Sequence, residues 1–377
     1  MKDDRLKAII HRFPDCRIAV LGDFFLDKYL DVDPTLAEIS VETGKTAHQV
    51  CSIRRSPGAA GTVVNNLAAL GVGRLHVLGF TGDDGEGFEL RRALRDLGCS
   101  IEGLLVLPDR FTPTYLKPRA CNTADLSGEH ERYDTKNRRQ TPLEAQTLIA
   151  GHLECLLPEL DAVIIVDQVE EAECGVVTTK VRESLAAFAE RQTTKIFWAD
   201  SRRRIGMFRN VIIKVNSHEA VKEIFPHGAP SARHRPAQGR QAGPGCRTGS
   251  SGARTSVVQP DDETTPDDGV VRKAMKQLRK RTGRPVFVTA GRRGIWIDDS
   301  RPMLVRGVRI PEPTDPTGAG DSATAGAVLA LCSGAGMQEA ALLANLVASI
   351  TVQQLATTGT AGPDQLGPRL ELWRSQG

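Results

Sequence analysis

The sequence predicts an α/β fold of three layers, in which helices cover both faces of a mostly parallel sheet and a small second sheet forms a lid. Short apolar runs alternate with helical stretches along most of the 377 residues. The runs are apolar throughout, which is typical of parallel strands that are buried on both faces. Two polar segments without a helical period, 28–57 and 111–134, interrupt this alternation and predict the lid.

The main elements can be followed in chain order. Continuous apolar runs predict strands at 17–22, 74–79, 161–167, 195–200, 211–216 and 285–291. Amphipathic or Ala-rich stretches predict helices at 59–71, 86–98, 142–157, 174–191, 270–283, 318–332 and 337–355. The third of these helices opens on a capping-box pattern, in which Thr141 is the cap and Pro142 takes the first helical position.

Three segments fall outside this scheme. Polar alternation, β-branched residues and proline in 28–57 and 111–134 predict antiparallel strands that project from the main sheet. Segment 228–266 is different, because twelve of the thirty residues in 231–260 are Gly, Pro or Ser. The other residues include too few large apolar side chains for their burial to offset the entropy lost when the segment is ordered. We therefore predict one domain over 1–377 with a disordered insertion at 228–266. A reading-frame error in the gene would give the same composition.

Composition argues against several classes of protein. The net charge is +3, and 231–260 alone carries five Arg and no acid, so we predict neither a nucleic-acid nor a membrane partner. The eight Cys are scattered without a CxxC pair, and the His residues lack the spacing of a metal site. The charged N-terminus lacks the apolar core of a signal peptide, and no apolar stretch approaches the ~18 residues of a membrane helix. These features predict a cytoplasmic protein.

Two glycine-rich motifs suggest other nucleotide sites but lack their context. Gly44-Lys45-Thr46 has Ile at position 39, where a P-loop needs Gly, and no buried strand precedes it. Residues 318–323 match GxGxxA, but only 54 residues follow, and they are helical. A dinucleotide fold requires further strands downstream, so hydride transfer is disfavoured.

Residues 315–321, DPTGAGD, carry the strongest chemical signal. They lie just before an Ala-rich helix, and their small side chains allow backbone N–H groups to converge at the helix N-terminus, where an anion is favoured. Asp321 would lie in the first turn. A carboxylate there can merely complement the helix dipole, or it can take a proton from an attacking hydroxyl, as the base does in phosphoryl transfer.

This string resembles the signature of the ribokinase-like, or phosphofructokinase-B type, carbohydrate kinases. Further matches occur in family order between about residues 17 and 360: GDFFLD at 22–27, PGAAGTVVN at 57–65, GFTGDDG at 79–85, KVNSHE at 214–219 and TAGRRG at 289–294. The second of these departs from the family pattern, with Ala59 at a Gly position and a shifted Asn65.

Within this family the chain is most similar to the D-glycero-β-D-manno-heptose-7-phosphate kinase type. The similar stretches are GDFFLDKY at 22–29, ISVET at 39–43 and TPTYLK at 112–117. No HxGH nucleotidyltransferase motif occurs, so we expect no fused adenylyltransferase.

The resemblance implies ATP-dependent phosphorylation of a sugar or sugar phosphate, with ATP and Mg²⁺ as cofactors, and it leaves room for a monovalent cation and a homodimer. Asp321 would be the base, and the N–H groups of Gly318, Ala319 and Gly320 would stabilise the phosphoryl group. The nucleotide would meet Thr289, Gly291, Gly294 and Asn345, the sugar would meet Asp23, Asp27, Gly58 and Asn65, and Mg²⁺ would be organised by Asn216 and Glu219.

Several interpretations stay open on the residues alone. Asp167 and Asp200 each end a buried strand and are expected to face one crevice, where Asp167 is a candidate substrate contact. Asn216 could simply cap a helix. Arg202, Arg203 and Arg204 form either a solvated loop or a clamp for a substrate phosphate. A catalytically silent sugar- or nucleotide-binding regulator on the same fold is the alternative function.

Overall fold

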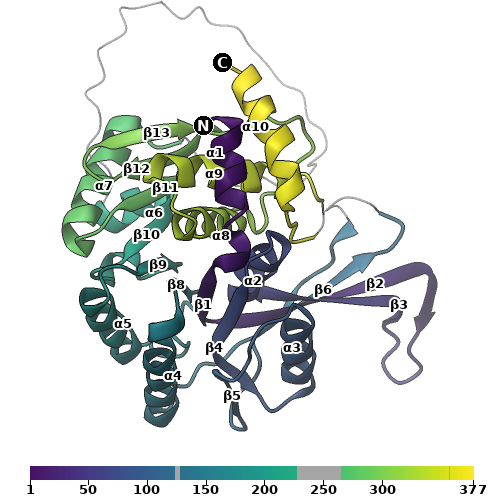
Figure 1. The fold of residues 1–377 in the computed structure, drawn as a ribbon. Helices are drawn as coiled ribbons and strands as arrows, with labels where there is room; N and C mark the ends of the chain where they lie inside the picture. The colour runs from purple at the N-terminus through teal and green to yellow at the C-terminus, as the bar shows by residue number, and fades with distance from the viewer. Residues whose placement is uncertain (124–127, 227–264, 356) are drawn as a thin grey trace, which may run out of the picture.

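The computed structural model describes residues 1–123, 128–226, 265–355 and 357–377. In these ranges the chain forms a nine-stranded sheet covered by helices and a four-stranded sheet that projects to one side (Figure 1). The predicted insertion lies outside the described residues except for positions 265 and 266. The assignment of one domain to 1–377 stays a prediction.

The nine-stranded sheet is mostly parallel, as the apolar runs predict. Its order is β13-β12-β11-β10-β9-β8-β1-β4-β5, and only β12 and β13 at one edge are antiparallel to their neighbours. The strands are β1 Arg17–Gly22, β4 Arg74–Gly82, β5 Leu104–Leu107, β8 Ala162–Asp167, β9 Ile196–Ser201, β10 Ile212–Asn216, β11 Val286–Thr289, β12 Gly294–Asp298 and β13 Pro302–Arg306.

Helices cover both faces of this sheet and complete the three layers. One face carries α1 Asp3–Ile10, α2 Ala60–Ala69, α3 Gly85–Asp96, α8 Ala319–Cys332, α9 Met337–Thr351 and α10 Leu366–Ser375. The other face carries α4 Leu143–Leu156, α5 Thr179–Arg191, α6 Ser217–Ile224 and α7 Asp268–Thr282. Alternate residues of β1 divide between the two cores, with Ile18 and Val20 in the first and Ala19 and Leu21 in the second. This alternation explains why buried parallel strands are apolar throughout.

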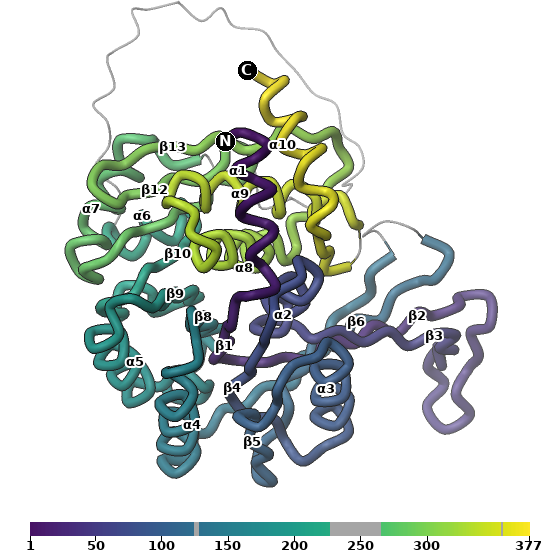
Figure 2. The backbone as a smooth tube through the Cα atoms, viewed as in Figure 1, coloured from purple at the N-terminus to yellow at the C-terminus, as the bar shows by residue number. Residues whose placement is uncertain are grey.

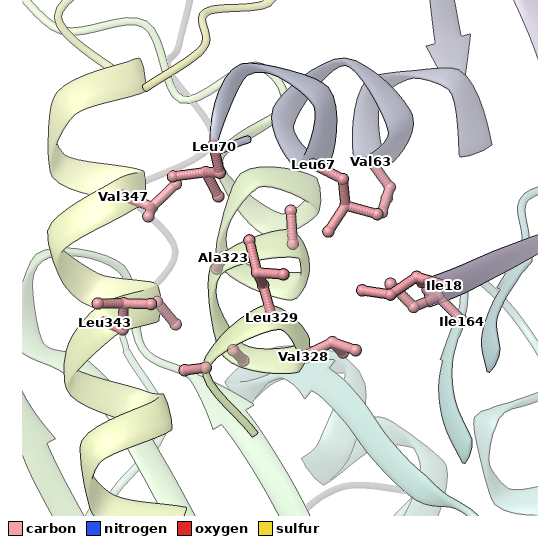
Figure 3. Close-up of a cluster of buried hydrophobic side chains, with 14 of the residues drawn as sticks. Ile18, Val63, Leu67, Leu70, Ile164, Ala323, Val328, Leu329, Leu343 and Val347 are labelled. Carbon is pink, nitrogen blue, oxygen red and sulfur yellow. The ribbon is translucent and has the colours of Figure 1, made fainter. Parts of the chain in front are cut away.

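Helix α8 lies at the centre of the first core. Figure 3 shows its residues Ala323, Val328 and Leu329 between α2, α9 and the sheet strands. Its small side chains allow close approach, since a Cβ at Gly326 would lie 2.9 Å from Val347 Cγ2 of α9. The whole helix is therefore wedged in place, and so is its N-terminus.

The two chain termini lie side by side at the same end of the molecule (Figure 2). Arg374 of α10 forms an ion pair with Asp3 of α1, with 2.7 Å between guanidinium nitrogen and carboxylate oxygen. No helix within the described ranges is long and apolar enough to cross a bilayer.

The four-stranded sheet has the order β3-β2-β6-β7 and continues directly from the main sheet. Its strands are β2 Phe24–Ile39, β3 Thr46–Ala59, β6 Thr114–Ala120 and β7 Tyr133–Thr135. The prediction of purely antiparallel strands is wrong in one respect, because β2 pairs with β6 in parallel. That pairing follows from the chain leaving the sheet after β3 and returning through α2, β4, α3 and β5 before β6.

Gly22 forms the joint between the two sheets. Its φ is +158°, and a Cβ there would lie 2.2 Å from the carbonyl oxygen of Val166 on β8. The N–H of Asp23 donates to that same carbonyl at 3.0 Å. Only glycine permits so close an approach. The chain passes from β1 of one sheet into β2 of the other at this residue.

Two predicted helix starts are wrong for identifiable reasons. Thr141 does not cap α4, because its hydroxyl donates to the carbonyl of Gly175 at 2.7 Å and the helix begins at Leu143 without a side-chain cap. Helix α5 begins at Thr179 instead of 174, because the N–H of Val176 donates to Asp23 and Thr178 is the cap.

Candidate functional site

The predicted functional residues gather at the carboxyl edge of the nine-stranded sheet. Strand register places Asn216 of β10 beside Thr289 of β11, and Lys214 of β10 beside Asp200 of β9. The ends of β8 and β1 are also adjacent, with Val166 beside Gly22. Because these strands are parallel, their carboxyl ends form one crevice, the usual ligand position in open α/β sheets.

The N-terminus of α8 faces this crevice as a ready anion site. Gly318 is the cap residue, with φ +75°, and no side chain caps the helix. Residues 318–321 are partly accessible. The N–H of Ala319 is less available to an anion than the sequence predicts, because it donates to the carbonyl of Pro316 at 3.1 Å. The remaining first-turn N–H groups have no acceptor within the helix and can serve an anion.

Asp321 lies in this first turn, as the sequence predicts. The pKa of its carboxyl is raised to about 7, mainly by burial and in part by the negative charges of Asp200 and Asp27. The positive charges of Lys214 and Arg202 oppose this rise. A carboxylate with a pKa near neutrality can both accept and release a proton at physiological pH, which is the requirement for a general base.

Lys214 is a member of the site that the sequence analysis missed. It is 6% exposed, and its Nζ lies 2.5 Å from Asp200 Oδ2 and 3.0 Å from the carbonyl oxygen of Gly320. Burial lowers the pKa of Lys214, but Asp200 and Asp321 raise it, so the lysine stays charged. The available signal was a lone lysine inside the apolar run VIIKVN, since a lysine is almost never buried without a partner.

Asn216 and Glu219 form a capping box at the start of α6. The N–H of Glu219 donates to Asn216 Oδ1 at 2.8 Å, and the N–H of Asn216 donates to Glu219 Oε2 at 3.1 Å. Burial raises the pKa of Glu219, and Asp200, Lys214 and Arg202 act on it electrostatically. Glu219 therefore belongs to the same charge cluster as Asp321, and the capping interpretation and the metal interpretation are compatible.

The residues expected to meet the nucleotide lie in two places. Thr289 ends β11, and Gly291 and Gly294 bound the following turn with φ values of +54° and +108°. Asn345 lies on α9, where its side-chain N–H₂ donates to the carbonyls of Val305 and Arg306 at 3.0 Å each. Its amide therefore ties α9 to β13, while Thr289, beside Asn216, and the turn that follows β11 lie at the carboxyl edge.

Asp27 and Gly58 lie together on β2 and β3 of the four-stranded sheet. Asp27 is 5% exposed, and its Oδ1 lies 3.3 Å from Lys117 Nζ of β6. Burial raises the pKa of Asp27, while Lys117 lowers it. A Cβ at Gly58 would lie 2.8 Å from Asp27 Oδ2, so a side chain at that position would displace the carboxylate. Asp27 is near enough to Asp321 for its negative charge to raise the pKa of the Asp321 carboxyl.

Asp23 and Asn65 are held by their own chain. Asp23 Oδ2 accepts from the N–H groups of Gln168 and Val169, and Oδ1 accepts from the N–H of Val176. The pKa of Asp23 is raised to about 6, mainly by burial and in part by the negative charge of the nearby Asp167. The three backbone N–H donors lower this pKa. Asn65 donates to Ser56 Oγ and to the carbonyl of Pro57. Both residues therefore shape the site by fixing loops.

Asp167 is 1% exposed, and both of its oxygens are occupied by donors of the same chain. Arg204 donates to Oδ1 at 2.7 Å and to Oδ2 at 3.1 Å, and Ser201 donates to Oδ2 at 2.6 Å. We therefore leave Asp167 and Arg204 out of the substrate contacts. Arg203 pairs with Glu170 at 2.7 Å on the outside. Arg202, unlike Arg203 and Arg204, lines a cavity that also includes Gln168 and Val169.

That cavity lies beside the joint between the two sheets and has a volume of about 80 Å³. Its cationic lining residues are Arg132, Lys136 and Arg202, and its aromatic ones are Phe25 and Tyr115. Glu170 and Glu171 also line it, and Arg202 Nε lies 3.4 Å from Glu170 Oε1. No sequence motif pointed to Arg132 and Lys136, which reach the cavity from the segment around β7.

Comparison with known families agrees with this arrangement. Residues 257–363 match the model of the pfkB family of carbohydrate kinases. The match covers 107 of the 377 residues of the chain. The matched region includes the first turn of α8 with Asp321, so the recognised family signature and the anion site coincide.

Curated relatives are similar to this protein over nearly the whole chain. The bifunctional protein HldE of Desulfatibacillum aliphaticivorans is 26% identical over 367 residues, 96% of this chain and 64% of the relative. The protein of the same name from Citrifermentans bemidjiense is 26% identical over 369 residues, 97% of this chain and 66% of the relative. The chain thus spans less than two thirds of the length of these relatives.

Solved structures with pfkB-type topology show that the fold is ribokinase-like. Phosphofructokinase-2 from Escherichia coli, in complex with fructose-6-phosphate, matches with a TM-score of 0.62 at 17% identity, over 95% of this chain and 99% of that one. Ribokinase from Cryptococcus neoformans, in complex with ADP, matches with a TM-score of 0.58 at 15% identity, over 94% and 99% respectively. The predicted three-layer architecture is confirmed.

Proposed function

We propose that this protein is an ATP-dependent kinase that transfers the γ-phosphoryl group to a hydroxyl of a sugar or sugar phosphate. One observation carries the proposal: Asp321 lies in the first turn of α8, which has no side-chain cap and which Lys214 of β10 holds at the carboxyl edge of the sheet through the carbonyl of Gly320. This arrangement puts a proton acceptor beside an anion site, and Asp27 of the four-stranded sheet is near enough to act electrostatically on Asp321.

The proposed reaction is a direct displacement. The acceptor hydroxyl oxygen attacks the γ-phosphorus, its proton passes to Asp321, and the bond between the γ-phosphorus and the β–γ bridging oxygen breaks to release ADP. First-turn N–H groups of α8 stabilise the charge on the transferring group. Asp27 would accept hydrogen bonds from sugar hydroxyls, and the charge of Lys117 favours its ionised form against the effect of burial.

The residues present fit a magnesium ion bound through the nucleotide. Mg²⁺ in such sites takes one or two protein oxygens and keeps waters and phosphate oxygens as its other ligands. Glu219 uses only Oε2 in the capping box, so Oε1 is left to hold the ion or its waters, with Asn216 beside it. The ion would neutralise phosphate charge. The described residues hold no group of three or more His, Cys, Asp or Glu placed to bind a metal by themselves.

The experiment that tests the proposal is release of ADP from ATP and Mg²⁺ in the presence of a panel of sugars and sugar phosphates. We expect acceptor-dependent turnover by wild type with at least one member. Binding of nucleotide and sugar without any turnover would instead identify a silent regulator. A monovalent cation is tested in the same assay by exchanging K⁺ for Na⁺ or tetramethylammonium.

We further propose that the preferred acceptor is already phosphorylated, with heptose 7-phosphate as the leading candidate. The support is the cavity lined by Arg132, Lys136 and Arg202, which is the right size for a phosphate group and its waters. Glu170 is shared between Arg202 and Arg203, so the carboxylate leaves donor capacity on the Arg202 guanidinium, which lines the cavity. Arginine donors form strong charge-assisted bonds to phosphate.

The matched test compares kcat/KM for paired free and phosphorylated sugars in Arg202→Ala, Lys136→Ala and the control Arg203→Ala. We expect the first two variants to lose most of the preference for the phosphorylated sugar, while Arg203→Ala keeps it. If free sugars are better substrates for wild type, or all three variants behave alike, the cavity does not select for phosphate.

A homodimer and a cytoplasmic location are also kept as predictions. The outer part of the hairpin formed by β2 and β3 exposes large apolar side chains, and a second copy of the chain would cover them: Leu36, Ile39, Val41, Val50 and Ile53. Sedimentation equilibrium of wild type against an Ile39→Ser, Val41→Ser variant measures this directly, because a dimer through this surface would dissociate in the variant.

A further inference from the structure

Lys214 makes two contacts that join three elements at the site. Its Nζ lies 2.5 Å from Asp200 Oδ2 on β9 and donates to the carbonyl of Gly320 on α8 at 3.0 Å, while the lysine itself belongs to β10. Its neighbours Ile213 and Val215 are buried core residues. The strand thus carries one charged group through an apolar layer to the edge, and Asp200 compensates the cost of burying it.

The contact to Gly320 fixes a particular peptide unit. The carbonyl of Gly320 and the N–H of Asp321 belong to the same planar peptide, so a donor on the carbonyl sets the direction of that N–H. The approach is close, because a Cβ at position 320 would lie 2.9 Å from Lys214 Nζ. Glycine at 320 is therefore matched to the lysine at 214, and together they fix the start of Asp321.

We propose that Lys214, anchored by Asp200, is a positioning residue for phosphoryl transfer, which holds the first turn of α8 against β10 and so sets the place of Asp321. This proposal rests on the proposed function, in which Asp321 is the base. Lys214 acts through Gly320 and through its charge, and the reacting atoms are left to Asp321 and the N–H groups of α8.

The charges that face Asp321 come from three directions. Lys214 of β10 and Arg202 after β9 are positive, while Asp200 of β9 and Asp27 of β2 are negative. Glu219 of α6 also acts on Lys214. Removing the ammonium group would leave Asp200 and Asp321 as like charges in a buried site, which favours the protonated form of Asp321. Removing the charge of Asp200 as well would relieve that repulsion.

The test compares wild type, Lys214→Met, Lys214→Met/Asp200→Asn and the exposed-lysine control Lys222→Met. Two quantities are measured: the pH dependence of kcat with ATP, Mg²⁺ and the best acceptor, and the titration of the Asp321 carboxyl by ¹³C NMR, assigned with Asp321→Asn. The NMR titration does not depend on turnover, so a protein without kinase activity would count against the proposed function and still report on Lys214.

For Lys214→Met we expect the acid limb of kcat and the NMR midpoint of Asp321 to move to higher pH by about one unit or more. We expect kcat at pH 7 to fall about tenfold, with KM for ATP changed less than about threefold. The double variant should return the midpoint toward wild type but keep a lowered kcat on the high-pH plateau, because the bond to Gly320 is still missing. Lys222→Met should match wild type.

Two results would overturn the proposal. An Asp321 midpoint in Lys214→Met equal to that of wild type removes the electrostatic role. A plateau kcat in the double variant equal to that of wild type removes the positioning role, and this measurement stands even if the single variant fails to fold.

Discussion

The nine-stranded sheet and the four-stranded sheet differ in how far their strands are buried. In β8 every residue is buried, and in β1 all but the first are, whereas β2 is buried only near its start and is exposed from Pro34 to Ile39. The candidate base and anion site belong to the first region, and Asp27 and Gly58 to the anchored end of the second. We call the nine-stranded sheet and its covering helices the platform. The residues proposed for phosphoryl transfer lie on this buried platform, whereas those proposed to bind the sugar lie on a sheet that is buried only at one end.

The strongest test of the platform is Asp321→Asn. We expect kcat to fall by ~10²–10⁴-fold, because general-base catalysis contributes that much, while ATP binding stays near wild type. The measurement is steady-state turnover together with calorimetric titration of ATP. Asp96→Asn, on the exposed surface of α3, is the control. A variant that keeps more than about a tenth of the wild-type kcat would remove Asp321 from the role of base.

The difference in burial is tested by a pair of truncations. Trp198 of β9 is fully buried and packs on Phe287, with ring centroids 4.7 Å apart, whereas Ile53 of β3 is 43% exposed. We expect Trp198→Ala to lower the free energy of unfolding by about 3–5 kcal/mol and Ile53→Ala by less than about 0.5 kcal/mol. Urea denaturation measures both. Equal effects would mean that the four-stranded sheet is as tightly packed as the platform.

Gly58→Ala tests whether the four-stranded sheet binds the sugar and not the nucleotide. The added methyl group would lie 2.8 Å from Asp27 Oδ2 and must displace it. We expect KM for the sugar to rise roughly tenfold, the scale of a mild overpacking, with KM for ATP nearly unchanged. Gly151→Ala on α4, where nothing lies within 4 Å of the new Cβ, is the matched control. A rise in both KM values would place Gly58 in the nucleotide site as well.

The smallest expected effect is a gain in stability at the joint between β3 and α2. Ala59 has φ +52° and ψ −116°, a conformation that glycine adopts without strain. We expect Ala59→Gly to raise the free energy of unfolding by about 1 kcal/mol. In the same helix, Ala68→Gly should lower it by about 0.5–1 kcal/mol. If both substitutions lower the free energy of unfolding, the backbone at residue 59 is not strained by its side chain.

The sequence predicted the main elements of the platform well because their signals are local. The run RIAVLG forms β1 over the predicted residues, and the two Ala-rich stretches form α8 and α9, although α9 ends four residues earlier than expected. Strands β12 and β13 and the N-terminal helix were not predicted. These elements are short, at five, five and eight residues, so each offers little periodicity to recognise.

The site was less predictable because it depends on partners distant in sequence. Asp321 could be assigned from the seven residues 315–321, which run into the first turn of its helix. Arg204 and Asp167 could not be recognised as an internal ion pair, since the pair forms across 37 positions. Thr141 has a perfect local capping pattern, but a carbonyl 34 positions away binds its hydroxyl instead. Local motifs therefore identify groups, and only tertiary contacts decide whether those groups are free.

The wedged position of α8 limits how the protein can change over evolution. Methyl-sized residues along the helix touch α2, α9 and the strands, and Gly326 has no room for even one more carbon against Val347. Almost any enlargement there would shift the helix and carry the anion site away from the sheet edge. Mutational tolerance is thus concentrated elsewhere, in β2, β3, β6 and the segment bearing Arg132 and Lys136. Libraries that seek a new acceptor should vary those segments and leave α8 untouched.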